Sequence, residues 1–133
     1  MDLRVTSKIQ KEYFKKTRRS RDLYKRSLSC FPGGISHNIR HFEPYPFYTK
    51  SAKGKLLRDV DGNDFTDYWM GHWALLIGHS HPVVASAVRN QASNGTLFGT
   101  ANKLSLDLAH AIKEGMPRAE LIRYSSTGSE ATM

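Results

Sequence analysis

Residues 53–69, KGKLLRDVDGNDFTDYW, carry the clearest folding signal in the chain. Asp61-Gly62 is a strong two-residue turn signal, and it separates two runs that contain leucine, valine and aromatic side chains. This pattern is typical of two antiparallel strands joined by a tight turn. We therefore predict a β-hairpin with strands at Leu56–Val60 and Phe65–Trp69.

The acidic residues of this hairpin also imitate the start of a calcium loop, with the spacing Asp59-x-Asp61-x-Asn63. In such a loop the glycine would be the sixth residue, whereas here it is the fourth, and Met70 stands where the ligating glutamate belongs. Turn chemistry therefore explains these acidic residues better than a calcium site does.

Most of the positive charge lies in the first 28 residues, which hold ten Lys/Arg and three acidic side chains, or +7 of the chain's net +8. One face of this segment predicts an amphipathic helix of about five turns with Ser7 as its N-cap. That face consists of Ile9, Tyr13, Ser20, Tyr24 and Leu28. A nucleic-acid-binding module on residues 8–26 is the alternative. Because the tyrosines lie on the apolar face and no nucleic-acid-binding signature accompanies the charge, the pattern favours a docked helix.

A turn-rich stretch, FPGGISHNIRHF, follows at residues 31–42. Pro32-Gly33-Gly34 ends the preceding helix, because proline lacks a backbone donor and the glycines permit positive φ. Arg40 is an isolated guanidinium whose planar fork of donors suits a carboxylate. From spacing alone, a surface arginine is the better interpretation of Arg40.

The segment IGHSHP, residues 77–82, leads into a predicted helix that starts at Pro82 and closes before Asn94-Gly95. His79 and His81 could suggest a metal site. Two imidazoles at positions i and i+2, without a cysteine or acid in the same segment, form a weak ligand pattern. We therefore predict no metal site and a role for both histidines in the loop and the helix cap.

The end of the chain predicts a helix, a strand and a turn. Leucine and alanine spacing favours a helix at Lys103–Glu114, with Gly115 as its C-cap. In the final stretch LIRYSSTGSEATM, we predict a strand at Leu121–Tyr124. Thr127 and Glu130 have the spacing of a capping box at a helix start.

This last turn has the chemistry of an anion site at Thr127, Gly128 and Ser129. Free backbone amides and hydroxyl groups converge there, at the positive end of the helix dipole. Taken alone the signal is weak, because many ordinary helices begin with such residues. Since only three residues follow the capping box, we expect the chain to be the first part of a longer protein.

Composition gives only broad limits. The sequence contains no apolar run long enough for a membrane span, and its start lacks a signal-peptide core, so we expect a cytoplasmic protein without a membrane association. Cys30 is the single cysteine and cannot form an internal disulfide. We predict that it is a small buried apolar residue.

Four motifs in this order resemble one family. FPGGISHNIRHF, DVDGNDFTDY, IGHSHP and STGSEATM are similar to the N-terminal part of the class III aminotransferases that depend on pyridoxal 5′-phosphate, and within them to the aminomutases. The resemblance implies an α/β protein, namely a truncated N-terminal portion of a fold type I aminotransferase. Residues 1–70 would form an N-terminal segment of basic helix, glycine loop and β-hairpin. Residues 71–133 would be the incomplete start of the large cofactor-binding domain.

The resemblance also assigns roles to residues that spacing alone leaves open. In the aminomutases, an arginine after the Pro-Gly-Gly loop binds the substrate carboxylate, and Arg40 occupies that position. The family's Ser-Gly-Thr-Glu-Ala segment holds the cofactor phosphate. Its counterparts here, which keep a hydroxyl group at both ends, are Thr127, Gly128 and Ser129.

One position departs from the aminomutase pattern. Where the family has Trp-Gly, an ungapped match places His72 on the tryptophan and Trp73 on the glycine. The family tryptophan lines the substrate pocket, so His72 and Trp73 are both predicted to bind substrate. A different amino donor and a one-residue shift that restores Trp73 are both open.

In the family, the lysine that binds the cofactor and the aspartate that holds its pyridinium nitrogen come far downstream of the phosphate turn. The resemblance therefore implies that these 133 residues contain no catalytic residue and that the chain is inactive alone. The parent enzyme would act on a small amino-acid-like substrate as a homodimer. It would move an amino group between adjacent carbons, or, as a class III ω-amino-acid or other transaminase, between an amino acid and a keto acid.

Overall fold

The computed structural model describes the backbone of residues 3–133 and the side chains of residues 6–133. The first two residues of the predicted 1–70 segment therefore lie outside the described residues. The chain divides into an N-terminal unit that ends at Val88 and a C-terminal unit, Arg89–Met133. Each unit is described by itself.

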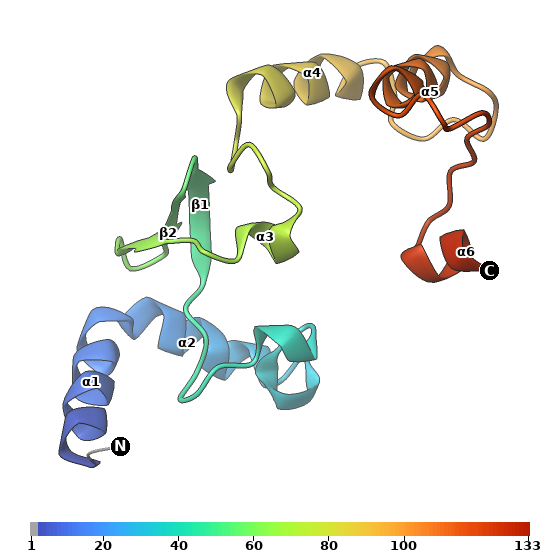
Figure 1. Cartoon of the computed structure of the whole chain (residues 1–133). Helices are drawn as coiled ribbons and strands as arrows, with labels where there is room; N and C mark the ends of the chain where they lie inside the picture. The colour runs from blue at the N-terminus through green and yellow to red at the C-terminus, as the bar shows by residue number, and fades with distance from the viewer. Residues whose placement is uncertain (1–2) are drawn as a thin grey trace. The chain divides into compact units, whose positions relative to one another are not determined.

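The predicted basic helix is two helices, so the expectation of one continuous helix was wrong. Helix α1 spans Leu3–Lys16 and helix α2 spans Arg18–Ser27. The two helices run in different directions (Figure 1). Thr17 between them has φ −123° and ψ 45°, outside the helical region. Because α1 already begins at Leu3, Ser7 is not its N-cap.

The break is stabilised by the hairpin turn, which lies more than 40 residues away in sequence. The Asn63 side-chain amide donates to the Lys16 carbonyl at the end of α1 (2.9 Å). The Asp61 carboxylate accepts from the backbone N–H groups of Arg19 (2.7 Å) and Ser20 (2.9 Å) at the start of α2. One turn therefore satisfies exposed backbone groups of both helices, which a continuous helix would not present.

Asp59 organises this turn from inside. Its side chain is 1% exposed. One carboxylate oxygen accepts from the backbone N–H groups of Asp61 (2.9 Å) and Asn63 (2.7 Å), and the other accepts from the Asn63 amide (2.8 Å). The interpretation of the acidic residues as turn chemistry is confirmed.

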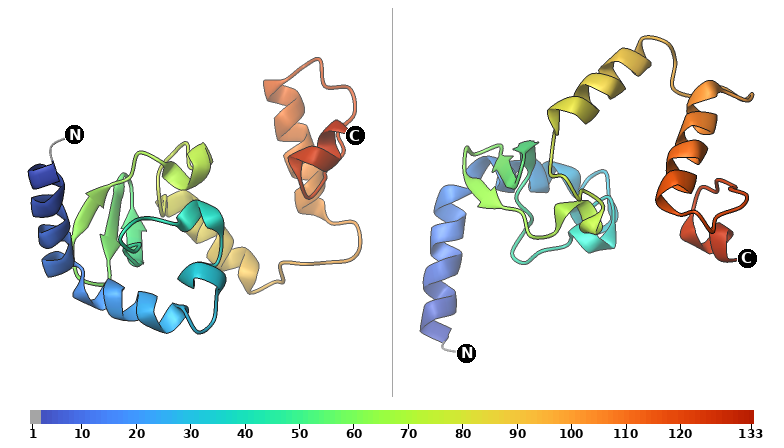
Figure 2. Two further views of the ribbon diagram at one scale, coloured as in Figure 1. Left: turned by 90° about the horizontal axis from the view of Figure 1, so that it is seen from below. Right: turned by 45° about the horizontal axis from the view of Figure 1, so that its top comes forward.

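The predicted hairpin is confirmed, with shorter strands and a third strand beside it. Strands β1 (Thr49–Lys53), β2 (Leu56–Asp59) and β3 (Asp64–Thr66) form an antiparallel sheet in the order β1-β2-β3. Leu57 pairs with Ala52 on one side and with Phe65 on the other. Figure 2 shows the green strands as one twisted sheet beside the blue helices of the same unit. The sequence interpretation did not identify β1, because its residues, TKSAK, lack an apolar alternation.

The core of the N-terminal unit is small and partly polar. Tyr45 is 4% exposed, and the rings of Tyr13, Phe14 and Tyr24 lie 5.2–6.1 Å from its ring. The Tyr45 hydroxyl group lies 3.0 Å from Thr17 Oγ1, and the Tyr13 hydroxyl donates to the Tyr45 carbonyl (2.8 Å). Burial raises the pKa of Tyr13 to about 12.

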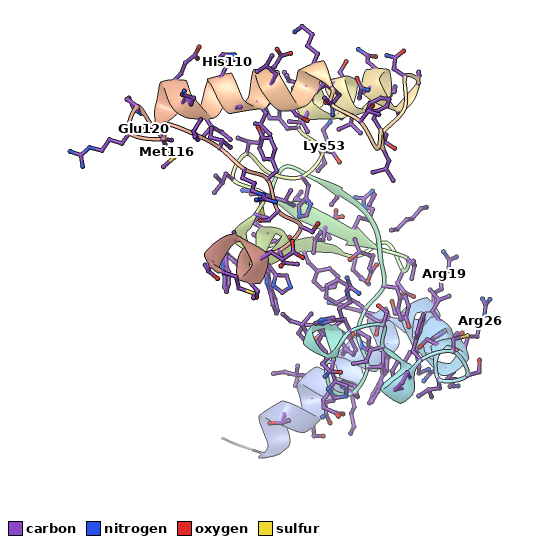
Figure 3. All side chains as sticks on the ribbon, turned by 90° about the vertical axis from the view of Figure 1, so that its right-hand side faces the viewer. Arg19, Arg26, Lys53, His110, Met116 and Glu120 are labelled. Atoms are coloured by element: carbon purple, nitrogen blue, oxygen red, sulfur yellow. The ribbon has the colours of Figure 1, made fainter. Side chains whose placement is uncertain are left out.

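This packing shows how the basic segment docks, through α1 and α2, on the rest of the N-terminal unit. Its tyrosines face Tyr45, so the docked helix favoured by the sequence pattern is confirmed, although Ile9 (58%) and Leu28 (53%) of the predicted buried face are more than half exposed. Arg26 extends away from α2 (Figure 3). Cys30 is exposed, so the prediction that it is buried was wrong. It lies beyond the end of α2 at Ser27 and is therefore not on the docked face of that helix.

The other elements are short helices. They are η1 (Pro32–Gly34), η2 (Asn38–Arg40), α3 (Met70–Trp73), α4 (Pro82–Ala92), α5 (Lys103–Gly115) and α6 (Gly128–Thr132). The predicted start of α4 at Pro82 is confirmed, as is the helix at Lys103. Its predicted C-cap was wrong, because Gly115 is helical and Met116 is the cap.

The predicted strand Leu121–Tyr124 is not formed. A strand requires a neighbouring backbone to pair with, and no described residue supplies one to this segment. Side chains and backbone groups hold it to α5 instead. The Tyr124 hydroxyl donates to the Ser105 carbonyl (2.8 Å), and the Lys113 amino group donates to the Glu120 carbonyl (3.0 Å).

Within the described part of the chain, no helix combines the length and the apolar character that crossing a bilayer requires.

Replacing Asp61 with alanine should destabilise the N-terminal unit by about 1–2 kcal/mol, because the start of α2 loses its cap. Asp22→Ala is the matched control, since it removes one negative charge from an exposed position on α2. Urea unfolding followed by tryptophan fluorescence measures the difference. Equal midpoints for the two variants would contradict the capping role.

The effect of Asp61 should also depend on pH. Burial works to raise the pKa of Asp61, but hydrogen bonds from Ser20 and Arg19 hold it below its ordinary value. The stabilisation is therefore complete above the ordinary aspartate pKa and is lost as the pH falls through the lower folded value. The stability gap between the unsubstituted chain and Asp61→Ala should shrink below about pH 4.

Candidate functional site

The predicted substrate residues His72 and Trp73 lie in a left-handed turn. Met70, Gly71, His72 and Trp73 have φ values of 48°, 59°, 62° and 61°, so α3 has the opposite hand to the other α-helices. The Trp73 N–H donates to the Trp69 carbonyl (2.8 Å), and the Leu75 N–H donates to the Met70 carbonyl (3.1 Å). This conformation costs about 1–2 kcal/mol for each residue with a side chain beyond hydrogen. Surrounding contacts must offset that cost.

The turn presents its side chains outward. Trp73 is 75% exposed, and His72 is also exposed. The Trp69 ring lies 5.1 Å from the His72 ring in a tilted arrangement. The structure thus places His72 and Trp73 next to each other in one turn and brings the Trp69 ring against His72. The substrate role of His72 and Trp73 stays a prediction. Trp69 was predicted only as the end of a strand.

Asp67 and His79 border this turn, and sequence reasoning did not select them as a pair. His79 Nε2 lies 2.6 Å from Asp67 Oδ2, and the two side chains are 17% and 9% exposed. The other oxygen of Asp67 accepts from the backbone N–H groups of Trp69 (2.7 Å) and Met70 (3.0 Å). The available signal was Asp67 itself, inside the predicted strand Phe65–Trp69, since aspartate often bonds to backbone groups two residues on.

These bonds change the acidity of Asp67. The hydrogen bond with His79 is the main cause that holds the pKa of Asp67 below its usual value, while burial works in the opposite direction. The N–H groups of Met70 and Trp69 add to the lowering. Asp67 is therefore a stable carboxylate at neutral pH and can anchor the turn.

Arg40 lies in η2, at the edge of a pocket with a volume of about 420 Å³. The walls of this pocket are mainly apolar and include Phe31, Phe42 and Phe47. The Arg40 guanidinium donates to Ser36 Oγ (2.7 Å), and no acidic side chain among residues 6–133 forms an ion pair with it. Arg40 therefore retains N–H groups that could donate hydrogen bonds to a carboxylate.

The predicted capping box at the last turn is formed. Thr127 Oγ1 accepts from the Glu130 N–H (3.1 Å), and Thr127 has the extended backbone of an N-cap. The Glu130 carboxylate reaches back to the Ser126 N–H (2.8 Å) instead of the Thr127 N–H. The predicted cap residue, Thr127, therefore starts α6. The bond from the Glu130 carboxylate falls one residue earlier than a capping box requires, at Ser126.

The same turn has donors suited to an anion. Within the described residues, the N–H groups of Gly128 and Ser129 have no acceptor, nor do the hydroxyl groups of Thr127 and Ser129. A Cβ atom added at Gly128 would meet no atom within 4 Å, so the turn is open there. These groups fit a phosphate. The Glu130 carboxylate works against anion binding, because it brings a negative charge to the neighbouring Ser126 N–H.

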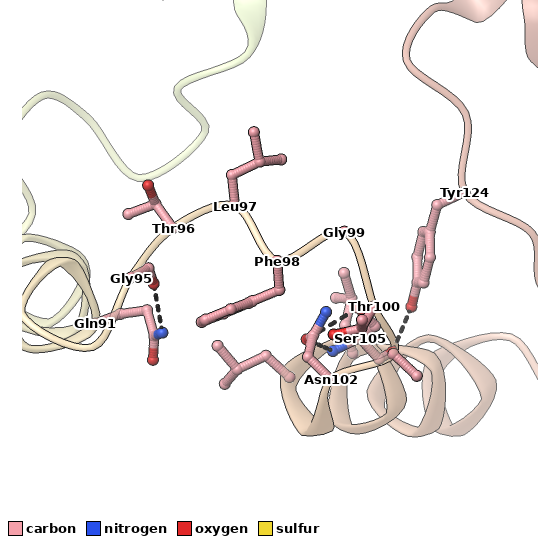
Figure 4. A pocket seen from close by; sticks show the side chains of 13 residues that line it. Gln91, Gly95, Thr96, Leu97, Phe98, Gly99, Thr100, Asn102, Ser105 and Tyr124 are labelled. Carbon is pink, nitrogen blue, oxygen red and sulfur yellow. Dashed lines mark hydrogen bonds between the residues drawn. The ribbon is translucent and has the colours of Figure 1, made fainter.

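A pocket of about 650 Å³ lies elsewhere in the C-terminal unit (Figure 4). Its wall includes Phe98 and Tyr124. At its edges, Asn102 Oδ1 accepts from the Ser105 N–H, and the Gln91 amide donates to the Gly95 carbonyl. Thr127, Gly128 and Ser129 do not line this pocket. The structure groups the predicted residues into a turn at His72 and Trp73, a separate pocket edge at Arg40, and the C-terminal turn.

Neither histidine of the IGHSHP segment gathers metal ligands in the described part of the chain. No group of three or more His, Cys, Asp or Glu side chains occurs among the described residues. His79 bonds to Asp67, and the backbone of His81 accepts the Ala85 N–H at the start of α4. The roles in the loop and the helix cap are confirmed.

Comparison with known proteins identifies one family. The sequence profile described as aminotransferase class III matches residues 38–133. The glutamate-1-semialdehyde 2,1-aminomutases of Methanosarcina acetivorans and Archaeoglobus fulgidus are 41% and 44% identical to this chain over 115 residues. Each match covers 86% of this chain and 27% or 28% of the relative.

A solved structure described as a transaminase with PLP bound is similar to this fold, with a TM-score of 0.82 and 33% identity. The match covers 88% of this chain and 28% of that structure. The helices and the small antiparallel sheet thus correspond to the N-terminal part of an aminotransferase fold, as the resemblance implied. The chain spans about a quarter of the length of these proteins.

The left-handed turn can be tested at Gly71. Gly71→Ala should destabilise the N-terminal unit by about 1–2 kcal/mol, because alanine resists positive φ. Gly71→Asn adds a Cβ atom at the same place, 3.3 Å from Leu75 Cδ1, but asparagine tolerates this backbone better. The free energy of unfolding measured in urea should therefore be highest with glycine at position 71, lower with asparagine and lowest with alanine. A smaller loss for alanine than for asparagine would contradict the left-handed turn.

Proposed function

Because the chain belongs to the class III aminotransferase family, we propose that it is the N-terminal portion of a pyridoxal 5′-phosphate-dependent aminomutase similar to glutamate-1-semialdehyde 2,1-aminomutase. Such an enzyme converts glutamate 1-semialdehyde to 5-aminolevulinate in tetrapyrrole biosynthesis. The observation that carries the proposal is the match to two aminomutases at 41% and 44% identity over 86% of the chain. The family match itself includes Arg40 and the phosphate turn.

In this proposal, the chain's own residues bind and orient. Thr127, Gly128 and Ser129 hold the cofactor phosphate through two hydroxyl groups and two backbone N–H groups. Arg40 binds the substrate carboxylate through the donors that Ser36 leaves free. The cofactor, when bound, supplies the electron sink for breaking bonds at the amine-bearing carbon.

His72 and Trp73 shape the substrate end of the site. A transaminase activity, with an ω-amino acid or another amino donor, is the second candidate function. Two observations favour it. His72 stands where the aminomutase pattern has tryptophan, and the similar solved structure is described as a transaminase.

The remaining parts of the proposal concern the parent protein. Residues 1–70 form its N-terminal segment, and residues 71–133 begin the cofactor-binding domain. The lysine that binds the cofactor is not among the lysines of this chain. The parent is a cytoplasmic homodimer that acts on a small amino-acid-like substrate and binds neither nucleic acid nor membrane.

An intact mass of the native protein, followed by an assay, tests the proposal. A mass well above 15.1 kDa is expected, together with formation of 5-aminolevulinate from glutamate 1-semialdehyde without an added keto acid. Turnover that requires a keto acid would support the transaminase instead. Suppose instead that the native protein has a mass of 15.1 kDa and, with added cofactor, neither forms 5-aminolevulinate nor transfers an amino group to a keto acid. That result would contradict both the aminomutase and the transaminase proposals.

Arg40→Lys should lower kcat/KM of the native-length enzyme roughly 10- to 100-fold, because a hydrogen bond to a charged group contributes about 1.5–3 kcal/mol. Arg26→Lys is the matched control, since Arg26 is exposed on α2. Steady-state kinetics of both variants with the same substrate measure the effect. An Arg40→Lys enzyme with unchanged kcat/KM would remove Arg40 from the substrate site.

A further inference from the structure

The segment between Asp67 and His79 is a loop whose two ends are joined by side chains. We propose that Asp67 and His79 are positioning residues: their contact forms a clasp that fixes the left-handed turn and so places His72 and Trp73. The contact is short, at 2.6 Å, and both side chains are largely buried. Assignment of the turn to the substrate site rests on the proposed function, but the clasp itself does not.

The clasp closes a loop that is already tied to the sheet at both ends. At one end the Asp67 N–H donates to the Lys55 carbonyl (2.8 Å). At the other end, Gly54 and His79 exchange two backbone hydrogen bonds of 2.9 Å each. Lys55 and Gly54 are adjacent, so both ends of the loop meet at the connection between β1 and β2.

Glycine is required where the second end approaches the sheet. Gly78 has φ +85°, and a Cβ atom added there would lie 3.0 Å from the Gly54 carbonyl oxygen. The backbone of His79 can therefore pair with Gly54 closely enough for its imidazole to reach Asp67. The Ser80 hydroxyl adds a bond to the Ala52 carbonyl (2.9 Å).

A single carboxylate links the clasp to the turn. Oδ2 of Asp67 contacts His79, while Oδ1 accepts the N–H groups of Trp69 and Met70, where the left-handed turn begins. Rotation of this carboxylate to follow a displaced His79 would break the bonds to Trp69 and Met70. The orientation of the imidazole is thereby coupled to the start of the turn.

Packing within the N-terminal unit does not replace the clasp. The apolar side chains of the loop are largely exposed, at 75% for Trp73, 93% for Leu76 and 60% for Ile77. A strained backbone without buried apolar support keeps its shape only if other contacts fix it. The partly buried Asp67–His79 contact is suited to that purpose, because its carboxylate also binds the start of the turn.

The two tryptophans of the chain, Trp69 and Trp73, both lie in this loop, so their indole N–H signals in two-dimensional NMR report on it directly. Asp67→Ala and His79→Ala should each move both indole signals to the position of free tryptophan. The double variant should show no larger change than Asp67→Ala, because Asp67→Ala already removes the contact with His79 together with the bonds to Trp69 and Met70. The backbone signals of Leu57 and Phe65 report whether the sheet stays folded.

Asp64→Ala is the matched control, because it removes an aspartate of the same hairpin whose partner, Arg58, is exposed. The indole signals should not move in this variant. His79→Gln, which keeps a side-chain donor toward Asp67, should restore part of the original indole positions.

Unchanged indole signals in both alanine variants, with the sheet intact, would overturn the proposal. Loss of the sheet signals in both variants would also overturn it, because the pair would then stabilise the fold instead of positioning the turn. The measurement requires neither cofactor nor substrate, so it separates this inference from the proposed enzymatic function.

Discussion

The hairpin turn at Asp59–Asn63 is the constraint on which the N-terminal unit depends. Helix termini leave backbone donors and acceptors without partners. Asn63 satisfies an acceptor at the end of α1, and Asp61 satisfies donors at the start of α2. The helices can therefore change direction at Thr17, which lets Tyr13 and Tyr24 both face Tyr45. A core with so few buried side chains gains its definition from these directional bonds.

A second use of the same principle occurs at the other end of β3. Asp67 follows the hairpin and binds the N–H groups that begin the left-handed turn, as Asp61 binds those that begin α2. The two turns differ in backbone strain. Three residues with side chains adopt positive φ between residues 70 and 73, and this conformation places an exposed histidine beside an exposed tryptophan. Strained backbone held by surrounding bonds is typical of sites where side chains must be presented in one orientation.

The groups with binding chemistry lie on loops and helix starts, not in the core. Arg40 lies in a 3-10 turn with donors to spare, and Thr127–Ser129 present hydroxyl and N–H groups at the start of α6. The family relationship is the basis for the proposal that Arg40 binds a carboxylate and that the turn at Thr127–Ser129 binds a phosphate. The chain spans about a quarter of the length of the relatives it matches.

Features whose partners are close neighbours in the chain could be predicted from the residues alone. These are the Asp61-Gly62 hairpin, the start of α4 at Pro82 and the bond from Glu130 to Thr127, since each depends on residues within about four positions. Family motifs led to the prediction that Arg40 and Thr127–Ser129 bind ligands, and that prediction stands as a proposal. Four features were found only in the folded chain: the break at Thr17, the strand β1, the left-handed turn and the contact between Asp67 and His79. The helix break and the contact between Asp67 and His79 depend on partners 12 to 47 residues away, and helical periodicity does not reveal a bond that a distant aspartate or asparagine makes to a helix end. The strand β1 pairs with residues close in sequence, but TKSAK lacks the apolar alternation that would mark it. Positive φ at Met70, His72 and Trp73 is an uncommon backbone conformation for residues other than glycine, so the residue types do not signal it.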